Sequence, residues 1–213
     1  MPSGSRSSPL ALAWSALGGG LRAQIGYDAT RELIQGRVKL RHPAPEDYEA
    51  WAMLRGESRA FLVPWEPSWG AQDLTRTAYR HRLRAYSRAI AAGESYPFFV
   101  YRRERGPLVG GLTLSNVRRG VTQSCALGYW IGAPFARQGY MSDAVKAALR
   151  FAFETLNLNR VEAACVPANE ASKRLLRKTG FREEGYARSY HQINGVWEDH
   201  LLFAVLASDP VPR

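Results

Sequence analysis

The chain has 213 residues, of which 46% are hydrophobic and 11% aromatic, and this length and composition suit one folded domain with a sizeable core. The same composition excludes a wholly disordered chain, and no apolar run reaches the roughly 18 residues that a membrane-spanning helix needs. The formal net charge of +10, from 29 basic and 19 acidic residues, indicates attraction to polyanions without naming one.

The first predicted segment is a flexible leader at residues 1–36, which starts with a Ser-, Pro- and Gly-rich stretch. A short apolar run inside it ends in three glycines, so we favour a leader over a secretory signal. The pattern is regular from residue 37 to residue 206, which predicts one domain followed by a short tail at residues 207–213.

The first half of this domain predicts one strand, two helices and three further strands. Residues 38–41 alternate as in a strand, and Pro45 with two acidic residues after it marks a helix start. Two prolines make residues 61–67 an aromatic loop, and residues 74–92 form an arginine-rich helix. Turn-like segments then separate strands at residues 98–102, 108–114 and 125–131.

The second half contains the clearest helix, residues 142–157, whose apolar residues recur at i, i+1, i+4 and i+5. A strand at 160–166 and a helix at about 170–179, which ends at Gly180, follow it. Asn194-Gly195 lies between two β-like runs, 186–193 and 196–206, and predicts a hairpin. The order βααβββαβαββ predicts an α/β (α+β) fold, a mixed sheet with helices on its faces.

The positive charge is concentrated between residues 76 and 119, where ten arginines accompany only Glu94 and Glu104. A phosphorylated cofactor, a nucleic acid or an acidic surface would be attracted to such a stretch. A solvated arginine-rich face explains it without a partner, and we favour this over a specific RNA site. The two cysteines, Cys125 and Cys165, lack metal-ligand spacing, so we expect reduced thiols, as in the cytoplasm, and no metal site.

The segment from Phe135 to Ser142 is the first candidate site. It joins a strand to the strongest helix, Gly139 allows a ligand close to the backbone, and free N–H groups at a helix start suit a phosphate. Arg137 adds a cation. A plain turn into a buried helix explains a single glycine as well, and neither a GxGxxG nor a Walker pattern is present.

Asn169 and Ser172 form the second candidate site, at the start of the next helix. By residue type Asn169 is first of all a helix cap, and Ser172 lies one turn inside, where its hydroxyl could reach a ligand above the sheet.

Taken together, these segments resemble the GNAT acyltransferase superfamily. The resemblance is carried by PFARQGYMSDAVKAALRFAF and by VPANEASKRLLRKTGF, and GYARSYHQINGVWEDHLLFAVL is similar to enzymes that acetylate the N-terminal alanine of ribosomal proteins. The stretches VKLRHPAPEDYEAW, FLVPWEP and LGYWIG agree with it. The resemblance covers residues 37–206.

The resemblance implies a GNAT-like three-layer fold, with acetyl-CoA in a splay between the fourth and fifth predicted strands, residues 126–131 and 160–166. The pyrophosphate would rest on Arg137, Gln138, Gly139, Tyr140, Met141 and Ser142. The pantetheine arm would contact Trp130, Ile131 and Asn169. The superfamily's phosphate motif has Gln or Arg where this chain has Ala136, and Gly or Ala in place of Met141, so Arg137 or Gln138 is expected to supply the missing contact.

The resemblance further implies that Ser172 protonates the departing thiolate. Backbone N–H groups at a bulge near Tyr129 would stabilise the carbonyl oxygen as negative charge builds. The amine must lose a proton before it attacks, and the candidates for the base are Glu66, His191 and Asp199. We expect Glu66 and His191 at the acceptor site and leave the base unassigned.

The sequence therefore predicts acetyl transfer, in a ternary complex, to the N-terminal alanine or serine of a ribosomal or other protein. The alternatives are a small-molecule N-acetyltransferase, for an amino acid or an amine antibiotic, and a catalytically decayed module associated with RNA or the ribosome. A chain of charge +10 repels basic ribosomal proteins. Either the arginine stretch contacts ribosomal RNA, which predicts binding that weakens with salt, or the acceptor is neutral or acidic.

Overall fold

The computed structural model describes residues 32–210, which form one sheet of eight strands. The strands are β1 (Leu33–Gln35), β2 (Val38–Arg41), β3 (Tyr96–Arg102), β4 (Leu108–Arg118), β5 (Ser124–Ile131), β6 (Arg160–Cys165), β7 (Arg182–Ile193) and β8 (Val196–Leu206). Their order across the sheet is β1-β2-β3-β4-β5-β6-β8-β7. All neighbours are antiparallel except β5 and β6, which are parallel.

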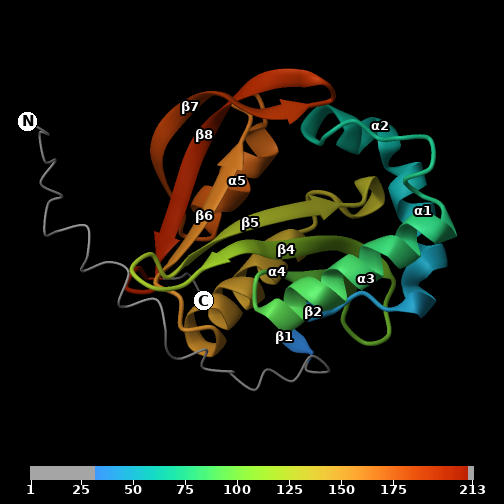
Figure 1. Cartoon of the computed structure of the whole chain (residues 1–213), viewed down its shortest axis with the longest axis horizontal. Coiled ribbons are helices and arrows are strands. Elements are labelled where there is room, and N and C mark those ends of the chain that lie inside the picture. Colours follow the sequence, from blue (N-terminus) through green and yellow to red (C-terminus); the bar gives the residue numbers. More distant parts are fainter. Residues whose placement is uncertain (1–31, 211–213) are drawn as a thin grey trace, which may run out of the picture.

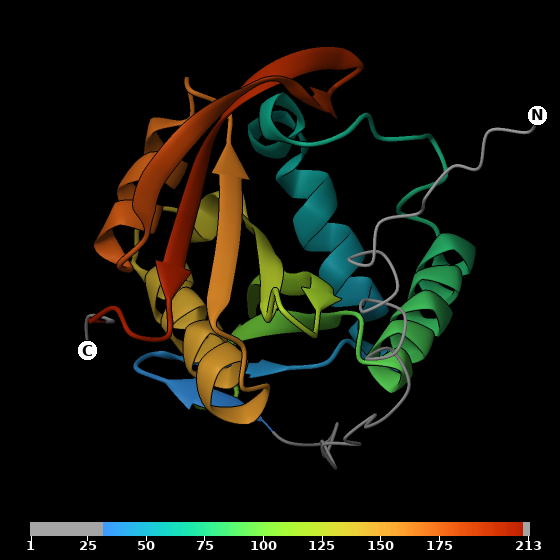
Figure 2. The same ribbon diagram turned by 60° about the vertical axis from the view of Figure 1, so that its left-hand side comes forward.

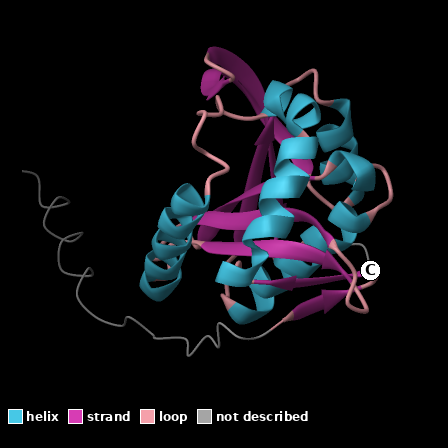
Figure 3. Ribbon diagram, turned by 90° about the vertical axis from the view of Figure 1, so that its right-hand side faces the viewer, coloured by secondary structure: helices cyan, strands magenta, loops and turns pink. Residues whose placement is uncertain are grey.

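Five α-helices cover the two faces of this sheet. They are α1 (Tyr48–Glu57), α2 (Arg59–Leu62), α3 (Arg76–Ala92), α4 (Tyr140–Arg150) and α5 (Glu170–Lys178). Helices α4 and α5 cover one face, and α1 and α3 cover the other, so the predicted three layers are confirmed (Figures 1 and 3). Within residues 32–210, no helix has the length and apolar character needed to cross a membrane.

Each face of the sheet has its own hydrophobic core. On the α4 face, the predicted apolar stripe of α4 is buried against the strands, with Ala144, Val145, Ala148 and Leu149 fully covered. The smaller core on the opposite face packs α1 and α3 on the sheet and consists of Trp51, Leu54, Tyr79, Phe99 and Leu108. Side chains that alternate along a strand therefore point into two different cores, one on each face of the sheet.

The sheet opens between β5 and β6. These strands pair only at one end, where Ser124–Ala126 lie beside Arg160–Glu162. Beyond Ala126, β5 continues along β4 and β6 continues along β8, so the two diverge into the predicted splay (Figures 1 and 2). The divergence leaves one backbone edge of β5 without a neighbouring strand from Leu127 onward.

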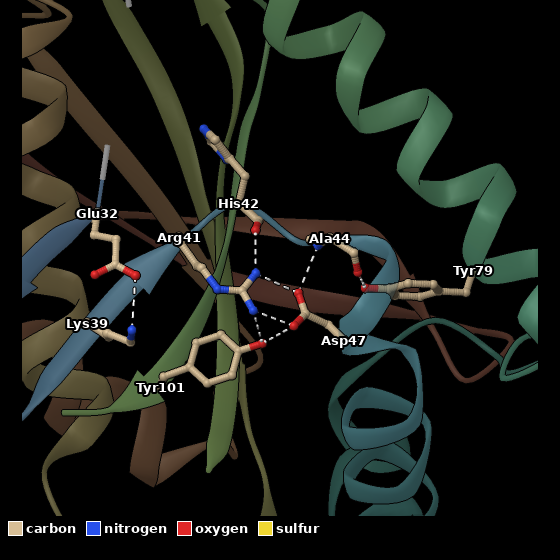
Figure 4. A network of polar contacts seen from close by, with 8 residues as sticks. All are labelled: Glu32, Lys39, Arg41, His42, Ala44, Asp47, Tyr79 and Tyr101. Atoms are coloured by element: carbon tan, nitrogen blue, oxygen red, sulfur yellow. Dashed lines mark hydrogen bonds and ion pairs between the residues drawn. The ribbon is translucent and has the colours of Figure 1, made fainter. Parts of the chain in front are cut away.

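A buried ion pair fastens the start of α1 to the sheet (Figure 4). Asp47, 4% exposed, accepts hydrogen bonds from Arg41 Nη1 at 2.8 Å, from the Tyr101 hydroxyl at 2.6 Å and from Ala44 N at 2.8 Å. With the second Arg41 donor, Nη2, at 2.5 Å, each carboxylate oxygen accepts two hydrogen bonds, which makes this network a main support of the β2–α1 junction.

The predicted elements are confirmed with three corrections. Strand β1 was missed, so the sheet starts before the predicted boundary at residue 37, while the rest of the leader, residues 1–31, lies outside the described residues. The aromatic loop at 61–67 is partly helical, because α2 and a 3₁₀ turn at Val63–Trp65 accommodate Pro64 in a first turn. The helix predicted to reach residue 157 ends as α4 at Arg150 and continues in a π-helical turn, Phe151–Thr155.

Candidate functional site

The loop between β5 and α4 has an unusual backbone conformation. Arg137 and Gly139 have φ angles of +61° and +83° on either side of Gln138, and a left-handed conformation of this kind favours glycine. The Gln138 side chain donates to Pro134 O at 2.8 Å, which fixes the loop from within. Left-handed residues next to helical ones turn successive N–H groups toward one side, where an anion can bind.

The start of α4 adds further N–H donors to this loop. The first helical hydrogen bond runs from Asp143 N to Gly139 O at 3.2 Å. The preceding N–H groups therefore have no acceptor within the helix, and they belong to Tyr140, Met141 and Ser142. Together with the positive end of the helix dipole, they make this end of α4 suited to a phosphate group.

The turn before β2 contributes a cation that the sequence analysis missed. Arg37 Nη1 donates to Gln138 O at 2.7 Å, and Arg37 Nε forms an ion pair with Asp143 at 3.0 Å. A Cβ atom on Gly139 would lie 2.4 Å from Arg37 Nη2, so the absence of a side chain at Gly139 makes room for this guanidinium. No local signal could have found this contact, because about 100 residues separate its two sides.

A basic cavity of about 460 Å³ adjoins the same loop, and its lining includes Arg37, Arg102, Arg103 and Tyr140. Arg102 and Arg103 belong to the arginine stretch predicted from sequence. The structure divides that stretch in space, because Arg80, Arg84 and Arg88 lie on the exposed side of α3 instead. The Gln138 side chain is held by Pro134, so of the two residues expected to replace the phosphate contact missing at Ala136, the exposed Arg137 is the one whose side chain has no partner among residues 32–210. The other cations near the loop are Arg37, Arg102 and Arg103.

The open edge of β5 presents the backbone of Tyr129 and Ile131. Gly132 N donates to Val109 O at 2.8 Å, and such hydrogen-bonded positions alternate along an antiparallel pair. The backbone of Trp130 therefore faces β4, whereas that of Tyr129 and Ile131 faces the splay. The backbone of Ile131 is therefore open to the contact expected of it, whereas Tyr129, not Trp130, offers the second one.

No bulge lies at Tyr129, contrary to expectation. The β4–β5 register is continuous from Leu114 to Gly110, and its only shift lies between Ser115 and Arg118. The N–H group of Tyr129 faces open space because β6 has diverged, not because the ladder is interrupted. The result is the same unpaired donor that the bulge was expected to provide.

Ser172 lies directly across the splay from β5. The Tyr129 and Ser172 hydroxyl groups are hydrogen-bonded at 2.7 Å, and Asn169 caps α5 by accepting from Ser172 N at 3.0 Å. Burial raises the pKa of Tyr129, so its phenol stays protonated at neutral pH and can donate to Ser172. The Ser172 hydrogen is then available for an atom in the splay.

The aromatic loop forms a wall on the α1 face. Both carboxylate oxygens of Glu66 accept from Arg55 at 2.8 Å, and Trp69 Nε1 donates to one of them at 3.0 Å. The Arg55 guanidinium in turn lies over the Trp130 ring, 4.9 Å from its centroid. Glu66 is therefore engaged by three donors, a geometry that suits a structural role in the wall better than the role of a proton acceptor.

The tip of the β7–β8 hairpin meets this wall. Asn194 N donates to Glu66 O at 2.9 Å, and α2 lies beside the hairpin tip in both Figures 1 and 2. Asn194 and Gly195 have φ angles of +45° and +85°, as the two central residues of a type I′ turn require, so the predicted hairpin turn is confirmed. The wall and the hairpin together close one side of the splay on the α1 face.

A groove of about 610 Å³ remains open on the same face. It lies between the C-terminal end of α3 and β7, and its lining includes Glu94, Ser115, Ala126, Glu162 and Tyr190. The next residue of β5 on this face is Gly128, and a Cβ atom there would meet nothing within 4 Å. Open space on this face of β5 therefore continues from the groove at Ala126 to Gly128, the residue before Tyr129.

The remaining two candidate bases lie on the β7–β8 hairpin. Asp199 accepts from the Tyr186 hydroxyl and from Ser189 N at 2.7 Å, and these two donors, Tyr186 first, lower the pKa of Asp199. His191 is exposed, and its ring centroid lies 4.9 Å from that of His200, which is 3% exposed. His200 is not predicted as a site residue, because nothing in the local pattern distinguishes it from other residues of a strand.

Comparisons with known proteins agree on one family. Residues 37–182 match the family described as Acetyltransferase (GNAT) domain. Over 168 residues the chain is 34% identical to the ribosomal protein uS5-alanine N-acetyltransferase of Escherichia coli (strain K12), an alignment that covers 78% of this chain and 87% of that protein. It is also 34% identical over 156 residues to the probable N-acetyltransferase YjcK of Bacillus subtilis, covering 73% and 86% of the two chains.

Solved structures give the same result. The structure of Mycobacterium smegmatis RimJ in complex with CoA-disulfide aligns with a TM-score of 0.79 at 31% identity, over 84% of this chain and 88% of that one. The ribosomal-protein-S5-alanine acetyltransferase of Vibrio fischeri aligns with a TM-score of 0.78 at 28% identity, over 85% and 100%.

Proposed function

The chain belongs to the GNAT acetyltransferase family, and we propose that it acetylates the N-terminal amine of a protein that begins with alanine or serine. It is an acyltransferase, and acetyl-CoA is its acetyl donor. Two relatives are named as acetyltransferases for an alanine of ribosomal protein S5 (uS5), which supports this class of acceptor. A ribosomal protein is thus the proposed partner, and the cytoplasm the proposed location.

The residues around the splay fit acetyl-CoA. The loop at Arg137–Ser142 offers unpaired N–H groups to the pyrophosphate, and the basic cavity beside it suits further phosphate charge. The backbone of Tyr129 and Ile131 can pair with the amide groups of the pantetheine arm, and Asn169 lies across the splay from them. When bound there, acetyl-CoA supplies the acetyl group as an activated thioester.

The chemical step uses groups on both sides of the splay. The N–H group of Tyr129 can donate to the thioester oxygen as negative charge develops. Ser172, backed by the Tyr129 phenol at 2.7 Å, can give its proton to the departing sulfur. A thiolate is a good leaving group, so a neutral hydroxyl is acid enough for this role.

The contact between the aromatic loop and the β7–β8 hairpin determines from which direction an acceptor can approach. The bond from Asn194 N to Glu66 O joins the wall to the hairpin, so an acceptor reaches Tyr129 along the groove and past Gly128. An extended chain end with its α-amine foremost can follow this route. A small amine would also fit it, whereas the intact Tyr129–Ser172 pair argues against a decayed enzyme.

A release assay for coenzyme A tests this function. The panel contains peptides that begin with Ala, Ser or Met, free amino acids and several simple amines, each with acetyl-CoA. We expect release with the Ala- and Ser-starting peptides and little with free amino acids. Release with amino acids or amines alone would instead establish the small-molecule alternative.

Arg137→Ala tests the position of the phosphates. Arg137 is exposed beside the α4 N-terminus, so its loss should weaken acetyl-CoA binding by roughly 10-fold while the fold is retained. Calorimetric titration with acetyl-CoA measures this, and Arg105→Ala, a charge-matched change in the β3–β4 turn, serves as control. Equal affinities for Arg137→Ala and the natural chain would place the phosphates elsewhere.

The sequence alone favours a solvated arginine-rich face, but from the arrangement of α3 we also propose, as part of the partner assignment, that its outer side contacts RNA. Arg80, Arg84 and Arg88 recur every four residues and are exposed, and none of them forms an ion pair with a residue between 32 and 210. Like charges at this spacing destabilise a helix slightly, and a bound phosphate backbone would relieve the repulsion. The same helix borders the acceptor groove through Ala89, so RNA held there would lie beside the acceptor.

Anisotropy titrations with a structured hairpin RNA at several salt concentrations test this contact. The variant R80Q/R84Q/R88Q should bind at least ~10-fold more weakly, with a salt slope smaller by about two or three charges. The control R174Q/R177Q/R182Q removes the same charge from α5 and β7 and should bind as the natural chain does. Equal weakening in both variants, or equal binding of an acidic peptide, would contradict an RNA contact on α3.

A further inference from the structure

A bulge in β7, the edge strand beyond β6 and β8, changes the direction of its side chains. Ala187 pairs with His200 and His191 pairs with Glu198, so residues 188–190 of β7 lie opposite Asp199 alone. Ser189, inside the bulge, has a φ angle of +45°, and its N–H group is held by Asp199 at 2.7 Å. Bulges of this kind redirect side chains and are frequent beside active sites.

The bulge brings three rings together. The Tyr190 and His191 centroids are 4.2 Å apart, and the His200 centroid lies 4.9 Å from His191 and 5.7 Å from Tyr190. His191 is on the exposed side of this group, and His200 is on the buried side. The exposed histidine can therefore meet a substrate, while the buried one can act only through its neighbour.

The tautomer of His200 follows from its hydrogen bond. Its Nδ1 lies 3.0 Å from Glu198 O, and a carbonyl oxygen can only accept, so Nδ1 carries the hydrogen. This bond keeps His200 in a fixed position behind the His191 ring.

The pair lies on the face of the sheet that carries the acceptor groove. Leu201 pairs with Cys165 and packs in the α4-face core, so the adjacent His200 points to the opposite face. His191 pairs with Glu198 across the strands, so the two side chains point to the same face. Glu198 is two residues before His200 on β8, so it points to the same face as His200, and His191 does so too. Tyr190 lines the acceptor groove, which connects the ring cluster to the path of the amine.

We infer that His191 accepts the proton of the acceptor amine and that His200 is the positioning residue that keeps His191 ready for this role. This inference rests on the proposed function. The ammonium group gives one proton to His191, and the neutral nitrogen forms the C–N bond while the C–S bond breaks. Ser172 gives its proton to the departing sulfur. The nitrogen then loses a second proton, which goes to the Ser172 oxygen and restores its hydroxyl. His191 afterwards releases its own proton to water.

The surroundings keep His191 uncharged at neutral pH. Partial burial and, second, charge repulsion from His200 lower the pKa of His191, which favours the neutral ring with its lone pair. The titratable and charged groups around the pair are Tyr190, Glu198, Asp199 and Arg188. Asp199 is held by the bulge, and Glu66 by Arg55, so neither of the other two candidate bases has comparable freedom.

Rates of acetyl transfer to an Ala-starting peptide, measured from pH 5 to pH 9, test the inference. His191→Gln should lower kcat by roughly 10- to 100-fold and abolish the fall in rate on the acidic side of the pH–rate profile, which we call the acidic limb. Imidazole added to His191→Ala should restore part of the rate. His200→Phe, which preserves a buried ring, should shift the acidic limb to higher pH while the rate on the plateau changes less than about threefold, because repulsion from His200 is lost.

His81→Gln, an exposed histidine of α3, is the matched control and should leave the whole profile unchanged. The peptide amine titrates identically in every assay, so a shift between variants belongs to the enzyme. A His191→Gln enzyme with the natural rate and profile would overturn the inference while the proposed function stands. A His200→Phe enzyme that lowers the plateau without moving the limb would reduce His200 to a packing role, and a natural chain that acetylates no peptide would overturn both proposals.

Discussion

Replacing Asp47 by Ala is expected to lower the free energy of unfolding by about 3–5 kcal/mol, because the change leaves the partly buried Arg41 guanidinium without its carboxylate. Tyr101 and Ala44 N lose their acceptor in the same step. Chemical denaturation at pH 7 measures the loss, and the thermal midpoint should fall by roughly 6–20 °C.

The exposed pair between Glu49 and Arg76 provides the control for this prediction. Its side chains are 76% and 58% exposed, so Glu49→Ala should cost less than about 1 kcal/mol. A similar small cost for Asp47→Ala would show that the network in Figure 4 does not support the β2–α1 junction.

Replacing Ser172 by Ala is expected to lower kcat by about 100-fold while acetyl-CoA affinity changes less than about threefold. The variant removes the proton donor for the sulfur but retains Asn169, whose side chain caps the Ser172 backbone rather than its hydroxyl. Tyr129→Phe should have a smaller effect, because Ser172 keeps its own proton after losing the phenol at 2.7 Å.

Steady-state kinetics and calorimetric titration separate the two effects of the Ser172 change. Ser87→Ala, on the exposed side of α3, is the control and should match the natural chain in both measurements. Lost affinity with an unchanged kcat would assign Ser172 to acetyl-CoA binding, and unchanged turnover would place the proton donor elsewhere.

Features with local signals could be predicted from the sequence. The hairpin turn at Asn194-Gly195 and the apolar stripe of α4 depend on residues a few positions apart, and both are found as predicted. The loop before α4 was recognised from Gly139, whose φ of +83° does require glycine. The splay between β5 and β6 was reached through resemblance to a family, since no spacing within the chain indicates where a sheet opens.

Features that depend on distant contacts could not be predicted. Arg37 over Gly139, the phenol of Tyr129 beside Ser172 and the ring of His200 behind His191 each join parts of the chain that local patterns do not relate. Glu66 illustrates the opposite case, because its residue type suits a base but its partner Arg55 leaves the carboxylate engaged. The ten arginines between residues 76 and 119 suggest one continuous basic region in the sequence. In the folded chain they are divided between α3 and the cavity beside the loop before α4.

The position of the transferred acetyl group tests the central claim most directly. Two peptides of matched length are incubated with acetyl-CoA and the chain, one with a free N-terminal alanine and no lysine, the other with a blocked N-terminus and an internal lysine. Fragment mass spectrometry then locates the added group. The acceptor route past Gly128 predicts an acetyl group on the alanine amine of the first peptide and none on the second, and acetylation of the lysine in preference to the N-terminus would contradict it.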